Sequence, residues 1–158
     1  MGVSFVHVNL IARDWKLLCA FYQRVFNCEP MLPEIDHKGD WIDAATGVSN
    51  VNIQGIHLLL PGCDKNCPTL EIFQYNRINE AKQPAINRPG LAHIAFAVDD
   101  VEIITKRVIS NGGSQLGDIV TEHIPKAGTI TFVYVRDPEG NIIELQNWSN
   151  KITDYTTP

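Results

Sequence analysis

The two halves of this 158-residue chain show the same sequence patterns in the same order. Each half opens with an apolar strand pattern that contains a histidine, His7 in the first half and His93 in the second. An aspartate follows seven residues later, Asp14 or Asp100, and an amphipathic helix pattern comes after it. This repeat constrains the fold strongly, because one copy of such a unit cannot bury its hydrophobic face alone. We therefore expect two similar modules.

The helix patterns are the clearest part of the repeat. Apolar residues recur at helical spacing after each aspartate, namely Leu18, Phe21, Tyr22, Val25 and Phe26 in the first half and Val101, Ile104, Val108 and Ile109 in the second. Asn27 and residues 111–113 are expected to end these helices. Asp99, with Glu102 three residues later, predicts a capping box at the start of the second helix.

The repeat also predicts the boundaries of the modules. Residues 77–90 are polar and contain two prolines, which is typical of a linker. We expect the first module over residues 4–76, the second over 91–148, and a C-terminal tail over 149–158. Residues 27–50 give the weakest pattern and are expected to be mostly loop, because Pro30 and Pro33 and a polar stretch interrupt them.

Strand patterns of period two show which side chains share a face. In the first strand Val6, Val8 and Leu10 lie on one face, and His7 and Asn9 lie on the other. The large apolar face suits packing under a helix, so the histidine faces the opposite side. The patterns predict an α+β fold in which two βαβββ modules form a curved mixed-sheet cup.

Each half ends with a strand pattern that contains a glutamate, Glu71 or Glu144. Burying an ionised carboxylate without a partner is costly. A divalent metal explains two carboxylates and two imidazoles, those of His7 and His93, in apolar strands. The alternative for each single residue is an ordinary core or surface side chain.

Composition excludes several classes of function. The net charge of −5 without a basic run argues against nucleic-acid binding. No apolar run approaches the roughly 20 residues of a membrane span, and no secretory signal pattern precedes the first strand. We expect a cytoplasmic protein. Cys63 and Cys67 lie in a loop bounded by prolines, and we expect ordinary reduced thiols there rather than a metal or redox site.

At these motifs the sequence resembles the vicinal oxygen chelate superfamily, which includes glyoxalase I, methylmalonyl-CoA epimerase, fosfomycin-resistance thiol transferases, extradiol dioxygenases and bleomycin-binding proteins. The resemblance covers about residues 4–148. It rests on the His7 strand with residues 20–22, on residues 70–72, on the stretch 90–100 around His93, and on residues 136–145 before and at Glu144.

The resemblance implies one divalent metal, Zn, Ni, Co, Mn or Fe, held by His7, Glu71, His93 and Glu144. It implies a glyoxalase-like lyase, isomerase or epimerase whose small substrate chelates the metal through vicinal oxygens. Glu144 and Glu71 are then the candidate catalytic bases. The alternatives are a metal-free small-molecule or drug-binding protein and an iron(II) extradiol-type dioxygenase.

Further residues on the same strands are candidates for substrate binding. These are His57, which is also a second candidate base, Asn9 beside His7, Phe73 beside Glu71, and Gln146 beside Glu144. The expected partners are a small-molecule substrate and a second copy of the chain in a homodimer. The sequence leaves open whether the cup closes within one chain or between two chains.

Overall fold

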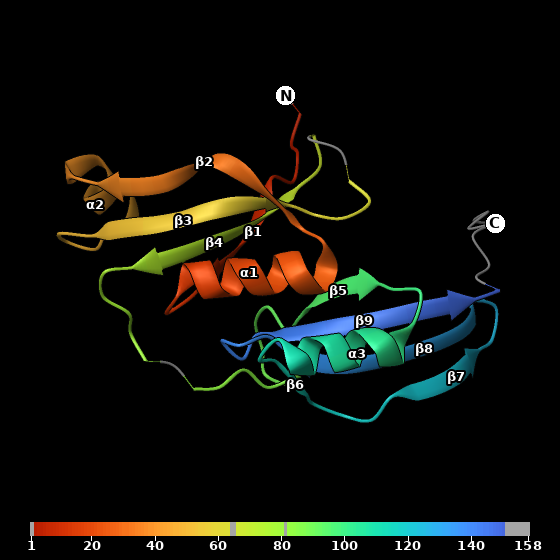
Figure 1. Cartoon of the computed structure of the whole chain (residues 1–158). Helices are drawn as coiled ribbons and strands as arrows, with labels where there is room; N and C mark the ends of the chain where they lie inside the picture. Colours follow the sequence, from red (N-terminus) through yellow and green to blue (C-terminus); the bar gives the residue numbers. More distant parts are fainter. Residues whose placement is uncertain (1, 64–65, 81, 151–158) are drawn as a thin grey trace. The chain divides into compact units, whose positions relative to one another are not determined.

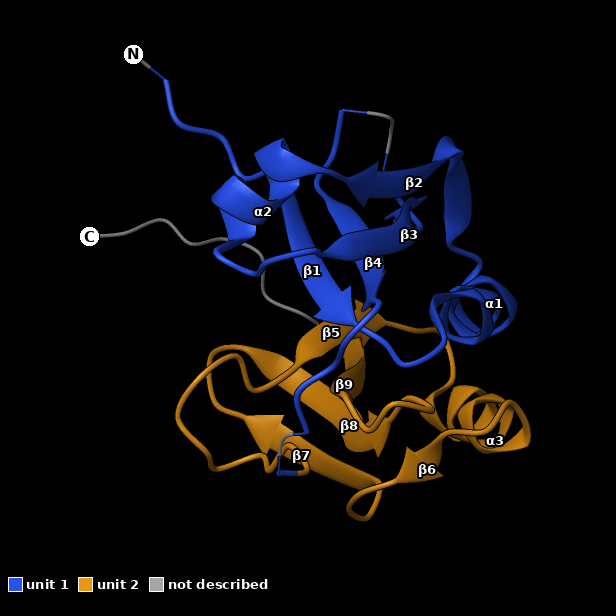
Figure 2. Ribbon diagram, turned by 90° about the vertical axis from the view of Figure 1, so that its left-hand side faces the viewer, with its two compact units in different colours: residues 1–82 blue, residues 83–158 orange. Residues whose placement is uncertain are grey.

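The computed structural model describes residues 2–63, 66–80 and 82–150 of the chain. The chain divides into two compact units, Met1–Lys82 and Gln83–Pro158 (Figure 2). Residues 151–158 of the predicted tail and Ala81 of the predicted linker lie outside the described residues. No helix in the described part is both long enough and apolar enough to span a membrane.

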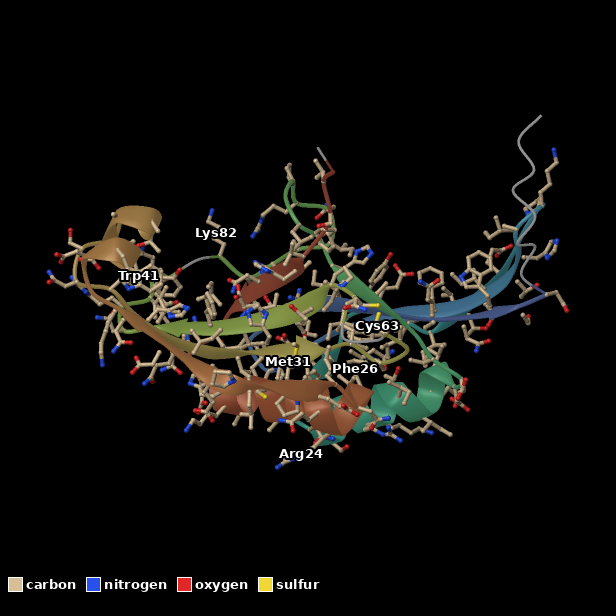
Figure 3. The ribbon with its side chains drawn as sticks, turned by 90° about the horizontal axis from the view of Figure 1, so that it is seen from above. Arg24, Phe26, Met31, Trp41, Cys63 and Lys82 are labelled. Atoms are coloured by element: carbon tan, nitrogen blue, oxygen red, sulfur yellow. The ribbon has the colours of Figure 1, made fainter. Side chains whose placement is uncertain are left out.

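Unit 1 is a mixed sheet with a helix on one face (Figure 1). Its elements in chain order are β1 (His7–Ile11), α1 (Trp15–Phe26), β2 (Glu29–Lys38), α2 (Asp40–Thr46), β3 (Asn52–Leu59) and β4 (Thr69–Tyr75). The strand order is β1-β4-β3-β2. β1 runs parallel to β4, and the other neighbouring strands are antiparallel. α1 packs against β3 and β4, and Arg24 on its outer side points away from the sheet (Figure 3).

Unit 2 repeats this arrangement. Its elements are β5 (Ile94–Ala97), α3 (Val101–Ser110), β6 (Ser114–Gln115), β7 (Val120–Ile124), β8 (Gly128–Arg136) and β9 (Ile142–Ser149). The strand order is β5-β9-β8-β6, and β7 also pairs with β8. β6 and β7 together take the place that β2 has in unit 1. The predicted α+β fold with two βαβββ modules is confirmed.

The two long helices begin and end for the same local reasons. The Asp14 side chain accepts a hydrogen bond from the Leu17 amide at the start of α1, and Asp100 accepts one from Ile103 at the start of α3. Such caps satisfy amides that have no partner inside the helix. Asn27 ends α1 in the left-handed conformation. The predicted capping box at Asp99 was wrong by one residue, because the cap is Asp100.

The main error of the sequence-based prediction lies in residues 27–50. Glu29–Lys38 form the strand β2, although Pro30 and Pro33 lie within it. β2 is an edge strand that pairs with β3 alone. Proline is tolerated there because one side of an edge strand needs no backbone donor. The short strands β6 and β7 were also missed, since neither carries a strong apolar alternation.

Candidate metal centre

In unit 1 a buried glutamate lies among polar side chains of three adjacent strands. Glu71 on β4 is 7% exposed, and its chain neighbours Leu70 and Ile72 are buried on the helix-covered face. The Glu71 side chain therefore lies on the opposite face. Its Oε2 accepts a hydrogen bond from Asn9 Nδ2 at 2.8 Å. His57 Nε2 lies 3.0 Å from Oε1, and His7 Nε2 lies 3.5 Å from Oε2.

These side chains form a group that could hold a metal ion. One potential ligand atom from each of His7, His57 and Glu71 lies within 4.8 Å of the others. Two imidazoles with one carboxylate are donors that suit first-row divalent ions. His57 is anchored on its other side, where Nδ1 lies 2.9 Å from Thr69 Oγ1. A partner on the second ring nitrogen is typical of histidines near metals. The residues present therefore fit a divalent metal.

In unit 2 the corresponding glutamate also has a histidine partner. His93 Nε2 lies 3.2 Å from Glu144 Oε2, and the His93 ring lies 5.3 Å from the ring of Tyr134. Burial raises the pKa of Tyr134, and its hydrogen bond to Glu144 and the charge of Glu144 raise it further. The hydroxyl therefore stays protonated at neutral pH and donates to the carboxylate.

The strand registers show that the two glutamates occupy equivalent positions. Glu71 pairs with His57 across β3 and β4, and Glu144 pairs with Tyr134 across β8 and β9. On the parallel side Glu71 pairs with Asn9, while Glu144 pairs with Ala95. The modules thus share the histidine and the glutamate. They differ in the two neighbours, where unit 1 has an imidazole and an amide and unit 2 has a phenol and a methyl group.

The structure places the predicted substrate-binding residues in different surroundings. Asn9 and His57 both contact Glu71, whereas Gln146 accepts a hydrogen bond from Trp148 Nε1. Phe73 packs against a small core of Ile42, Val51 and Ile53. A Cβ added to Gly55, its cross-strand partner, would lie 2.7 Å from Phe73 Cδ1. Phe73 therefore has a structural contact on two sides.

The sequence did not predict that His57 and Tyr134 would contact the two glutamates. His57 was expected to contact substrate, and the structure adds it to the group around Glu71. Tyr134 was not singled out at all. Each follows from the pairing of two antiparallel strands. The sequence signal is the length of the connection between the strands. The turn of residues 137–141 between β8 and β9 is short enough to predict the pairing of Tyr134, whereas a long loop sets the register weakly. The loop between β3 and β4 spans residues 60–68.

The sequence also matches a known family. The sequence model of the Glyoxalase/Bleomycin resistance protein/Dioxygenase superfamily matches residues 4–145. The chain belongs to this superfamily. The resemblance predicted from the histidine and glutamate motifs is therefore confirmed. No curated protein sequence matches the chain significantly.

Solved structures of the superfamily share the fold across nearly the whole chain. A glyoxalase family protein from Bacillus cereus superposes with a TM-score of 0.79 at 16% identity, covering 94% of this chain and 95% of that one. A genomically encoded fosfomycin resistance protein from Listeria monocytogenes gives 0.60 at 19% identity, with 95% and 97% covered. Another structure of that protein, in complex with Mn(II) and sulfate, gives 0.52 at 18% identity, with 95% and 96% covered.

Proposed function

We propose that this protein is a metal-dependent lyase, isomerase or epimerase that binds a small substrate through two vicinal oxygens. One observation carries the proposal. Both modules direct the Nε2 of a histidine toward a glutamate carboxylate, and both glutamates occupy the same register position. Two unrelated histidine–glutamate pairs would not be expected to occupy equivalent positions in the two modules. Binding of one ion by both histidine–glutamate pairs best explains why their positions match.

The proposed ligands are His7 and Glu71 from unit 1 and His93 and Glu144 from unit 2. His57 is assigned a different role because of its hydrogen bonds. Both of its ring nitrogens already have a partner, because Nε2 lies 3.0 Å from Glu71 Oε1 and Nδ1 lies 2.9 Å from Thr69 Oγ1. We therefore assign His57 to orienting Glu71 and not to the ion. His7 Nε2, at 3.5 Å from Oε2, is the nitrogen that remains for the ion.

The chain's own groups would control the two carboxylates. Asn9 and His57 hold one oxygen each of Glu71, which keeps that side chain in a single orientation. Glu144 accepts a hydrogen bond from Tyr134, and His93 Nε2 lies 3.2 Å from its Oε2. A bound divalent ion supplies Lewis-acid polarisation of a substrate oxygen, which makes a neighbouring C–H more acidic. We assign proton removal to a Glu144 oxygen or a Glu71 oxygen.

The test is the metal content of the full-length protein after expression in metal-replete medium. We expect one ion per chain in the wild type and less than a tenth of that in His7→Ala and in His93→Ala. His123→Ala, which changes an exposed histidine on β7, is the matched control and should keep its metal. Mn(II) is the first ion to load, because a fosfomycin resistance protein of the same fold binds it. A wild type without a near-stoichiometric ion would overturn the proposal.

A second function is favoured by the His7, His57 and Glu71 group itself. Two histidines and one carboxylate are also the ligand set of non-haem iron(II) oxygenases. In that case His57→Ala should lose the metal as completely as His7→Ala, and the wild type should consume oxygen with a catechol. Under the proposal above, His57→Ala keeps the ion and Glu144→Gln loses activity while retaining the fold.

A further inference from the structure

A groove of about 380 Å³ opens in unit 1 beside His57. Several chain segments meet there. Met31 of β2 is the cross-strand partner of His57, and Thr69 bonds to the His57 ring. The Thr69 amide in turn donates to the carbonyl of Val6. The groove therefore crosses from β2 through β3 and β4 to the segment before β1. Met31, which lines it, lies toward Cys63 and away from Trp41 of α2 (Figure 3).

The walls of this groove combine large apolar side chains with uncharged polar ones. Phe5, Val6 and Met31 line it, and the lining residues in the described part of the chain include no Asp, Glu, Lys or Arg. Phe5 is 67% exposed and Val6 is 62% exposed. Large apolar side chains that face a concave surface and remain exposed are typical of a ligand site. The volume also lies in the range of small-molecule pockets.

His57 connects the groove to the candidate metal centre. One side of its ring lines the groove, and its Nε2 lies 3.0 Å from the Glu71 carboxylate. A molecule seated in the groove therefore extends directly to the residues around Glu71. Ser4 and Asn66 add uncharged polar groups elsewhere in the lining. An occupant should then be oxygen-rich at the His57 end and should present an uncharged, apolar surface to Phe5, Val6 and Met31.

We propose that this groove is the subsite for an uncharged, apolar substituent of the substrate, such as a short alkyl chain or an aryl ring. The inference rests on the proposed function, in which the vicinal oxygens of the same molecule are held at the metal. It narrows the substrate class. A conjugate that placed an anionic group in this groove would meet no Lys or Arg among the described lining residues, and desolvating that anion would weaken binding.

The experiment uses hydroxamic acids, which chelate divalent ions through two vicinal oxygens. Acetohydroxamic and hexanohydroxamic acid are titrated into the full-length Mn(II)-loaded protein, and Kd is measured by calorimetry. The longer compound should bind on the order of a hundredfold more tightly if its chain is buried in the groove. Val6→Asp should remove most of that gain, measured as the ratio of the two Kd values in the same variant. Val3→Asp, in the same segment but outside the groove, is the control.

The results separate two kinds of failure. If acetohydroxamic acid binds and the longer compound gains nothing, or if Val6→Asp keeps the gain, the groove is not the subsite. If no Mn(II) or no hydroxamate binds, the proposed function fails. In that case a measurement without metal tests whether the groove by itself binds an apolar group. Benzyl alcohol should slow alkylation of Cys67, which lines the groove, several-fold more than that of Cys63, which does not. Equal effects on both thiols would overturn the inference.

Discussion

At the scale of single residues, the side chains around Glu71 show how a carboxylate is held in the interior. Asn9 donates to one oxygen and His57 approaches the other. A hydrogen bond to a charged group contributes about 1.5–3 kcal/mol, more than one between neutral groups. The contacts therefore offset part of the free-energy cost of burying Glu71, and they orient it.

Replacing Asn9 by alanine tests this role. Asn9→Ala should lower the free energy of unfolding by about 1–3 kcal/mol, because Glu71 Oε2 loses its closest donor. Metal affinity should fall roughly tenfold to a hundredfold, as expected when the partner of a ligating carboxylate is removed. Urea unfolding and Mn(II) titration measure the two effects. Asn79→Ala, at an exposed position, is the control; an equal loss in both variants would contradict the assignment.

The cysteines differ in reactivity because they differ in burial. Burial raises the pKa of the Cys28 thiol to about 12, and it also raises the pKa of Cys19. The thiolate is the reactive form, so both should react with iodoacetamide far more slowly at pH 8 than the exposed Cys63. Peptide mass spectrometry over time measures this order. In denaturant the difference should vanish; rapid labelling of Cys28 in the folded protein would refute the prediction.

At the scale of elements, helix starts and sheet edges follow local rules. The aspartates that cap α1 and α3 occupy equivalent positions in the repeat. β2 accommodates two prolines because it lies at the edge of its sheet. These rules explain why α1 and α3 were predicted well, whereas β2 and the short helix α2 were not. The position of a strand within its sheet is not encoded in the strand itself.

The cap of α3 can be assigned by two adjacent substitutions. Asp100→Ala should lower the free energy of unfolding by about 1 kcal/mol, because the Ile103 amide loses its acceptor. Asp99→Ala should change it by less than about 0.5 kcal/mol, since Asp99 is exposed and its side chain does not cap the helix. Thermal or urea unfolding compares them. A larger effect at Asp99 would restore the capping box predicted from the sequence.

At the scale of the whole molecule, the chain is a duplicated module whose copies have diverged in detail. The cross-strand partner of the glutamate is His57 in one unit and Tyr134 in the other. One row further along the same face, Gly55 pairs with Phe73 in unit 1, and Phe132 pairs with Gln146 in unit 2. The phenylalanine therefore lies on the strand of the glutamate in unit 1 and on the neighbouring strand in unit 2. The histidine and the glutamate keep the same positions in both units.

Metal binding should be visible in the stability of the full chain. A ligand that binds only the folded state stabilises it by about 2.7 kcal/mol at a hundred times its Kd. For a chain of this size that corresponds to a rise in Tm of roughly 5–10 °C. Mn(II) should raise the Tm of wild type and of His123→Ala, and it should leave His7→Ala and His93→Ala unchanged. A rise in only one of the last two would show that a single module holds the ion.

The sequence by itself determined the repeat, the two long helices, the superfamily, the strands that carry His7, Glu71 and Glu144, and the place of His93 directly before β5. These depend on periodicity and spacing along the chain, which local propensity and burial produce directly. Only the tertiary structure decided which side chains flank each glutamate. His57 and Tyr134 reach the carboxylates through strand pairing, and the groove beside His57 forms from four segments that are distant in sequence. Register and edge position are properties of the assembled sheet, because backbone hydrogen bonds between strands are the same for every sequence.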